Sequence, residues 1–197
     1  MRYLIFVSFA ALLLVAVFWS GPEPRTVPGV LVPYEPERVA IIDPTQWTYK
    51  DCRITTVAHL RLRARVLLTE HYSTGDEAAL APVDLTVGWR LMSNQDILDE
   101  LRLFRMPRSY GLRFRNTRLP ARPPELANHS ANLSLIPSSD DIARRLDAVE
   151  RTDLIDLSAY FVEVRFPSGR VWRSSAGRPL EGVGPSQVLW VSALSKM

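Results

Sequence analysis

The chain has 197 residues, of which 47% are hydrophobic, and a formal net charge of +3. This composition is typical of a globular protein with one domain large enough to bury its own core. The only cysteine, Cys52, excludes an internal disulfide, so we expect it to be buried and inert or available for an intermolecular bridge.

Arginine accounts for 22 of the 24 basic residues, since Lys50 and Lys196 are the only lysines. A GC-rich genome is the simple explanation of this bias. The functional alternative is bidentate recognition of phosphate or carboxylate, which arginine performs better than lysine.

Residues 1–20 form the one long apolar run and predict an N-terminal signal anchor. From Tyr3 to Trp19 there is no charged residue, proline or glycine. In a helix, residues 3–19 would span roughly 25 Å, near the lower limit for crossing a bilayer core. Arg2 favours a cytoplasmic N-terminus, which places the rest of the chain in the periplasm.

A cleaved signal peptide is the main alternative, and a buried core helix is a further one. Cleavage needs small residues at positions −3 and −1. Cuts after Ser20 or Gly21 would place Phe18 or Trp19 at −3, and both sites are poor. A lipoprotein would need its cysteine at the end of the run, far from Cys52.

Six prolines make residues 21–50 resemble an extended stalk. Its hydrophobic residues argue against a wholly solvated linker, so we expect its later half to lie on the domain or to add an edge strand. Residues 51–197 then form the periplasmic domain.

The clearest strand pattern covers His59–Leu68, where apolar residues alternate with Arg61, Arg63 and Arg65. Pro82–Trp89 predicts a second, shorter strand. Ser93 is expected to cap a helix that carries Ile97, Leu98 and Leu101 on its apolar positions.

Seven arginines occupy residues 102–122, within which Tyr110, Leu112 and Phe114 alternate with Arg113 and Arg115 in a strand-like pattern. Residues 128–137 are expected to be irregular backbone. They precede a helix that Ser138 would cap and that carries Ile142, Leu146 and Val149 on one face.

Asp153–Phe166 predicts a long central strand, and Pro167, Ser168 and Gly169 a hairpin turn into residues 170–173. Residues 177–184 are expected to form a loop before a last strand, Gln187–Ala193. About five or six strands and two helices indicate an α+β domain. We expect a mainly antiparallel sheet or a small partly open barrel, preceded by one transmembrane helix.

Known catalytic and metal motifs are absent from the sequence. Three scattered histidines without metal spacing predict no metal site, and no cofactor is expected. His129, Ser130 and an acid such as Asp156 could be drawn as a hydrolase triad. The alternative is that His129, Asn128, Ser130 and Asn132 hydrogen-bond an irregular backbone.

The arginines allow a binding hypothesis. Arg61, Arg63 and Arg65 are expected on one strand face, and Arg113 and Arg115 on another. If these strands were neighbours, their crowded charges would favour an anionic partner such as a lipid headgroup or an acidic polymer. The alternative is pairwise neutralisation by acids such as Asp84, Glu100 and Glu163.

Several segments resemble an uncharacterised family of bacterial membrane-anchored proteins. They are PGVLVP (28–33), APVDLTVGW (81–89), HSANLSLIP (129–137), LSAYFVEV (157–164), WRSS (172–175) and VLWV (188–191). The resemblance implies a Gram-negative origin and brings no activity, cofactor or catalytic residue. Pro185, Ser186 and Gln187 stand where the family pattern has Ala-Cys-Glu.

The sequence thus predicts a single-pass inner-membrane protein whose periplasmic domain is a binding or assembly module rather than an enzyme. Its expected contact residues are Arg61, Arg63, Arg65, Arg113, Arg115, His129 and Asn132. The membrane, through residues 3–19, and an envelope protein or anionic ligand are the expected partners, and nucleic acid is not expected. The alternatives are a periplasmic hydrolase with a site around His129 and an anion-binding sensor of the envelope.

Overall fold

The computed structural model describes residues 27–116, 121–174 and 185–197. The predicted anchor and the loop expected at 177–184 lie outside these residues. The described part of the chain contains no helix that combines the length and the apolar character needed to cross a membrane.

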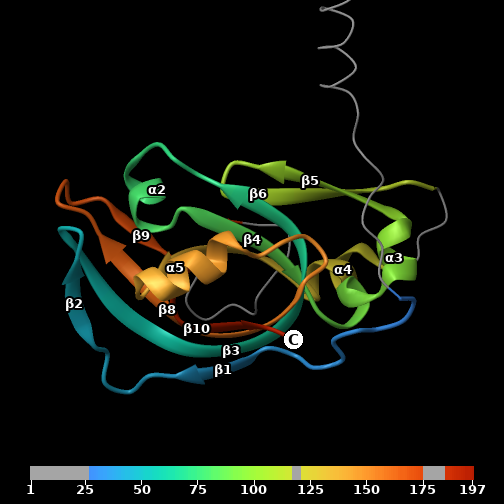
Figure 1. Cartoon of the computed structure of the whole chain (residues 1–197), viewed down its shortest axis with the longest axis horizontal. Helices are drawn as coiled ribbons and strands as arrows, with labels where there is room; N and C mark the ends of the chain where they lie inside the picture. Colours follow the sequence, from blue (N-terminus) through green and yellow to red (C-terminus); the bar gives the residue numbers. More distant parts are fainter. Residues whose placement is uncertain (1–26, 117–120, 175–184) are drawn as a thin grey trace, which may run out of the picture.

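The described residues form a mainly antiparallel sheet with four α-helices, which confirms the α+β class (Figure 1). The strands are β1 (Glu37–Ala40), β2 (Gln46–Tyr49), β3 (Cys52–His71), β4 (Val83–Gly88), β5 (Leu101–Met106), β6 (Ser109–Phe114), β7 (Ser130–Pro137), β8 (Leu154–Arg165), β9 (Val171–Arg173) and β10 (Gln187–Lys196). The helices are α2 (Asp76–Leu80), the 3₁₀ helix η1 (Arg90–Ser93), α3 (Gln95–Asp99), α4 (Pro123–Asn128) and α5 (Asp140–Asp147).

Strand β3 organises the sheet because it is 20 residues long and pairs with four other strands. Its residues 53–65 pair with β8, and its residues 65–71 pair with β4. The order continues through β7 and β10 back to β8, so five strands form a closed cycle of pairings. Only β7 and β10 run parallel to each other within this cycle.

The inner face of the cycle holds the main core. It is lined by alternate residues of each strand, such as Leu60, Leu85, Leu133, Leu157 and Leu189, all of which are fully buried. The period-two patterns that predicted β3 and β4 therefore mark the residues that point inward.

Both faces of β4 and β7 are buried, and β7 corrects the interpretation of one segment. Residues 128–137 were expected to be irregular, but residues 130–137 form β7 between β4 and β10. Their sequence lacks alternation because polar residues of β7 find buried partners on the outer face, as described below.

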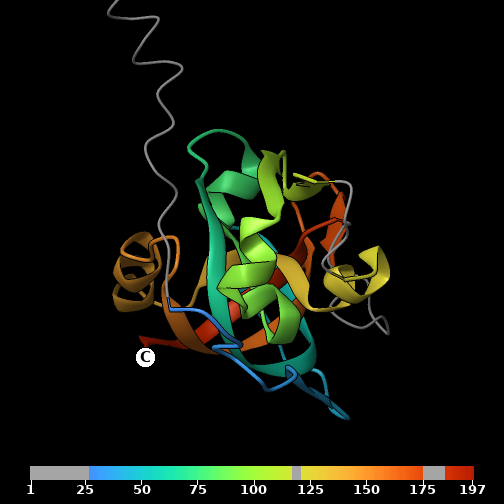
Figure 2. The same ribbon diagram turned by 90° about the vertical axis from the view of Figure 1, so that its right-hand side faces the viewer.

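Two helix caps also differ from the prediction by one residue. The Asn94 side chain accepts a hydrogen bond from the Asp96 amide and caps α3, whereas Leu101 already belongs to β5. The Ser139 hydroxyl, not Ser138, accepts a hydrogen bond from the Ile142 amide at the start of α5. Figure 2 shows α5 and α4 at opposite flanks of the sheet, with α3 between them at the front.

The later part of the predicted stalk lies on the domain. Val32 is 2% exposed and joins the main core, and β1 adds an edge strand to β3. This confirms the expectation for the second half of residues 21–50. Residues 29–35, which precede β1, are called the strap below.

Candidate binding surfaces

The arginines of the binding hypothesis lie in three different places. Strand β6, with Arg113 and Arg115 on or beside it, pairs with β5 in a separate two-stranded sheet and not with β3. The idea of one crowded face of five guanidinium groups is therefore wrong, because sheet pairing separates the two strands.

Arg61 and Arg63 are exposed on β3 and line a groove of about 380 Å³ across β1, β3 and β8. The groove is lined by Tyr34, Glu35, Glu37, Arg61, Leu62, Arg63, Asp156 and Ser158. Arg63 Nε donates to Asp156 Oδ2 at 2.9 Å, as the pairwise alternative anticipated, although with a different acid. Arg61 lies opposite Glu37 in the β1–β3 register and forms no hydrogen bond or ion pair with a described residue.

Aromatic side chains lie beside this groove on the outer face of the sheet. His59 of β3 and Tyr160 of β8 lie opposite each other, with ring centroids 5.0 Å apart. On the other side of β8, Trp190 of β10 lies opposite Tyr160. Trp47 and Tyr49 of β2 each contact the Trp190 ring edge-on at 5.0 Å. A half-buried aromatic surface thus borders a polar, mixed-charge groove.

Arg65 has a different environment from Arg61 and Arg63, although it follows the same alternation. It is 2% exposed because η1 and α3 cover this end of β3. Its guanidinium donates to the Ser93 carbonyl at 3.3 Å and to Gln95 Oε1 at 2.6 Å, both uncharged acceptors. Burial lowers the pKa of Arg65, and nearby Arg151 lowers it further.

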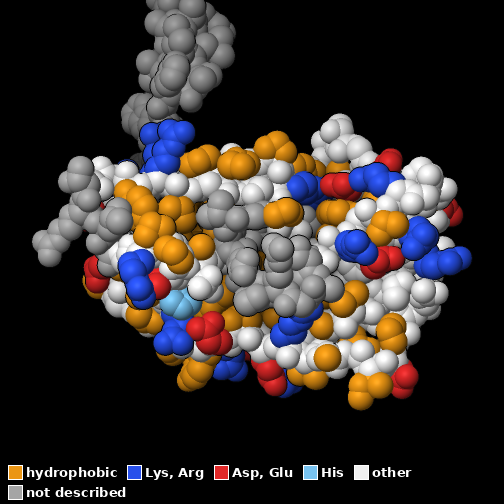
Figure 3. Space-filling view, turned by 180° about the vertical axis from the view of Figure 1, so that it is seen from behind, with side chains coloured by type: hydrophobic (Ala, Val, Ile, Leu, Met, Phe, Trp, Pro, Cys, Tyr) orange, Lys and Arg blue, Asp and Glu red, His pale blue; other side chains and the backbone are white. Residues whose placement is uncertain are grey.

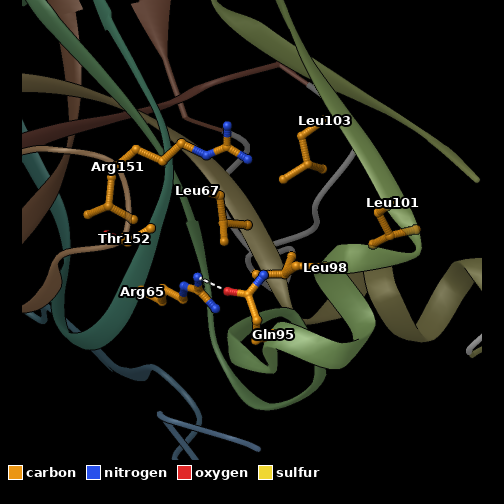
Figure 4. A pocket seen from close by; sticks show the side chains of 9 residues that line it. Arg65, Leu67, Gln95, Leu98, Leu101, Leu103, Arg151 and Thr152 are labelled. Atoms are coloured by element: carbon orange, nitrogen blue, oxygen red, sulfur yellow. Dashed lines mark hydrogen bonds between the residues drawn. The ribbon is translucent and has the colours of Figure 1, made fainter. Parts of the chain in front are cut away.

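Figure 4 shows the guanidinium groups of Arg65 and Arg151 directed toward a small pocket walled by Leu98, Leu101 and Leu103. The pocket holds about 10 Å³, enough for one water molecule but not for a substrate. Arg65 Nε, which has no hydrogen-bond partner among the described residues, is the group such a water would satisfy.

The proposed triad residues have separate partners. The Ser130 hydroxyl is 2.6 Å from the Tyr110 hydroxyl and also bonds the Leu126 carbonyl. Asp156 binds Arg63, as described above. Burial raises the pKa of Tyr110 to about 12, so this hydroxyl stays protonated and serves as a structural donor or acceptor.

His129 instead lies beside the strap. Its Nε2 is 3.7 Å from Glu35 Oε1, while Nδ1 is buried without a hydrogen-bond partner among the described residues. Glu35 also accepts hydrogen bonds from Trp89 Nε1 at 2.7 Å and from Arg90 at 3.0 Å. Burial lowers the pKa of His129, and Glu35 offsets part of this effect. These contacts fix the strap to the domain.

Asn132 belongs to a buried polar centre on the outer face of β4 and β7. Its Nδ2 donates to Asp84 Oδ2 at 2.9 Å, and its Oδ1 accepts from the Thr86 hydroxyl at 2.9 Å. Asp84 is 2% exposed and also binds Arg108 Nη1 at 2.5 Å. Burial raises the pKa of the Asp84 carboxyl, which the charge of Arg108 partly opposes.

Arg108 comes from the turn between β5 and β6. Its guanidinium lies 4.0 Å from the Tyr72 ring centroid and 5.4 Å from that of Trp172. Its backbone amide donates to the Tyr72 hydroxyl at 3.1 Å. The hairpin is thereby fastened over β4 and β7, and the polar centre is occupied by the protein itself.

Neither Asp84 nor Arg108 was singled out as a site residue, although Asp84 was considered as a neutraliser. Their contact joins positions 24 residues apart, which no local pattern encodes. Positive φ at Arg108 is the one local peculiarity, and it is not visible in the sequence.

Cys52 is buried, and burial raises the pKa of its thiol, so it is protonated at neutral pH. Within the described ranges no three histidine, cysteine or acidic side chains gather as metal ligands would. No protein-family model, curated protein or solved structure matches this chain.

Proposed function

We propose that the protein is a single-pass, membrane-anchored binding module of the periplasm, with a small barrel of the OB type as its domain. The strand order β3–β4–β7–β10–β8, the parallel β7–β10 pair and helix α5 between β7 and β8 support this assignment. OB-type barrels commonly bind oligonucleotides and oligosaccharides on the face of their second and third strands and on adjoining loops, and these strands are β4 and β7 here.

The groove across β1, β3 and β8 is the proposed ligand site. The outer face of β4 and β7 is closed by the hairpin and Arg108, whereas the groove is open and carries the exposed Tyr34 ring. Arg61, with no partner among the described residues, is the observation that carries the proposal.

The charges of the groove favour a hydroxyl-rich ligand over a polyanion. Two arginines are balanced by Glu35, Glu37 and Asp156, so the groove has no cationic excess. The Arg63–Asp156 pair presents fixed donors and acceptors, and aromatic rings lie beside it. Such a surface suits a saccharide chain, and the glycan strands of the cell wall are the periplasmic polymer of that chemistry.

The test is co-sedimentation of the detergent-solubilised full chain with purified cell-wall sacculi. We expect the wild type to sediment and the double variant Tyr34→Ala/Arg61→Ala to bind about tenfold more weakly, since it loses hydrogen bonds and ring contact. A wild type that stays in the supernatant, or an unaffected double variant, would overturn the proposal.

His129→Ala is the matched control for the hydrolase alternative. A binding module should sediment unchanged, because His129 does not line the groove and because Trp89 and Arg90 still hold Glu35 of the strap. A hydrolase would release soluble fragments from the sacculi, and this variant would abolish that release.

A further inference from the structure

The outward face of the β5–β6 hairpin combines basic and apolar side chains. Residues 101–114 contain four arginines and no acidic residue. Two of the four bind the domain: Arg105 pairs with Glu70 at 2.8 Å, and Arg108 with Asp84. The other two, Arg102 and Arg113, are exposed on the opposite face.

Arg102 and Arg113 are direct cross-strand partners in the β5–β6 register. Like charges in this position repel each other, so the pair costs stability unless an anion lies between them. Arg102 forms no hydrogen bond or ion pair with a described residue, and the Arg113 guanidinium lies 5.2 Å from the Phe104 ring centroid. The pair is therefore a ready acceptor of an external anion.

Apolar side chains lie next to this pair on the same face. The Phe104 ring packs directly over Gly111, where a Cβ atom would collide with it. Met106, two residues further along β5, is 43% exposed. Figure 3 shows hydrophobic and basic side chains together along the upper edge of the molecule, the edge that β5 and β6 form in Figure 1.

The hairpin is also close in the fold to the point where the chain enters the domain. The Gly29 amide donates to Asn94 Oδ1 at 3.3 Å, and Asn94 caps α3, which leads into β5. From Ser20 to Gly29 the chain can span at most about 30 Å. If residues 1–20 are the anchor, this end of the domain is held near the membrane surface.

We propose that the outward face of the hairpin, centred on Arg102, Phe104, Met106 and Arg113, docks on anionic phospholipids of the inner membrane. The two guanidinium groups bind lipid phosphates, and the ring and the thioether enter the headgroup region. The acidic Asp99 and Glu100 lie near Arg102 at the base of the hairpin, where Asp99 accepts a hydrogen bond from Gln95 and Glu100 accepts one from Asn116. This inference rests on the proposed membrane anchor.

The test uses the full chain reconstituted in lipid nanodiscs and hydrogen exchange of the amides at 101–114. We expect stronger protection in nanodiscs that contain phosphatidylglycerol than in nanodiscs of phosphatidylcholine alone, because only the former carry net negative charge. The difference should shrink with added salt. Arg102→Glu/Arg113→Glu should abolish it, and Arg102→Lys/Arg113→Lys should retain part of it.

Arg144→Glu/Arg173→Glu is the control of equal charge change at exposed positions outside the hairpin, and it should behave as the wild type. Equal protection in both lipids would overturn the inference, as would the same protection from inorganic phosphate added to neutral nanodiscs. A chain without an anchor would not enter nanodiscs, so failure of the anchor proposal is recognised separately. Sacculus binding is measured in detergent and does not depend on this docking.

Discussion

At the scale of single residues, the most consequential contact is the buried pair of Asp84 and Arg108. A carboxylate that is 2% exposed is tolerated because Arg108 and Asn132 both donate to it. The sequence placed Asn132 among ligand-binding residues, but its buried amide donates to Asp84 and accepts from Thr86 inside the protein. The Asn132 side chain thus stabilises the fold and is not free to bind a ligand.

Asp84→Ala should destabilise the domain by about 3 to 5 kcal/mol, because the largely buried Arg108 guanidinium loses its close acceptor and keeps only the more distant Glu77, at 3.7 Å, among the described acids. Equilibrium denaturation in urea measures this loss. Asp156→Ala, which removes the acid of a half-exposed pair with Arg63, should cost at most about 1 kcal/mol. Equal losses for the two variants would contradict the buried pair.

At the scale of elements, the strap changes the interpretation of residues 21–50. Val32 is buried, its amide donates to the Ser93 hydroxyl at 3.0 Å, and its carbonyl accepts from the Arg90 amide at 2.6 Å. The proline-rich composition predicted an extended segment, but it could not show that residues 29–35 are bound to the domain. If residues 1–20 anchor the chain as proposed, the distance that the domain can reach from the membrane depends on residues 21–28.

Val32→Asp should detach the strap, because it places a carboxylate in the main core without a partner. We expect native trypsin digestion to cleave after Arg38 much faster than in the wild type, as followed by mass spectrometry. Val30→Asp is the matched control, since Val30 is 46% exposed on the strap itself. Similar cleavage of both variants would argue against a bound strap.

The elements also show where sequence patterns succeed. Strands β3 and β4 were predicted because apolar and polar residues alternate along them. Strand β8 was predicted because its middle is apolar on both sides, and β10 because its side chains alternate as in a strand. Strand β7 was missed because Asn132 and Ser134 on its outer face meet buried partners on Asp84, Thr86 and Ser186. The caps Asn94 and Ser139 were missed by one residue because adjacent serine and asparagine residues are equally suited to capping.

At the scale of the whole molecule, the closed cycle of five strands explains why the two proposed binding surfaces lie apart. The groove proposed for a glycan lies across β1, β3 and β8, and the proposed lipid face lies on the hairpin over β4 and β7. A tethered domain with separate surfaces for wall and membrane would be suited to bridging the two.

The anchor itself gives the last prediction. We expect the mature chain isolated from membranes to begin at Met1, because bulky Phe18 and Trp19 stand before each possible cleavage site. Intact-mass measurement of the purified protein tests this. A mature start near Gly21 would overturn the anchor and make the domain a free periplasmic protein.

The sequence by itself determined the features that depend on local patterns: the apolar run at 1–20, the α+β class and the strands with one apolar face. The tertiary structure alone decided which outer faces are covered. Arg61, Arg63 and Arg65 share one alternation, yet only Arg65 is buried, because η1 and α3 fold over that end of β3. The tertiary structure also decided that Arg102 lies opposite Arg113 and that Arg108 binds Asp84. Periodicity reports which way a side chain points, whereas long-range pairing decides what it meets there.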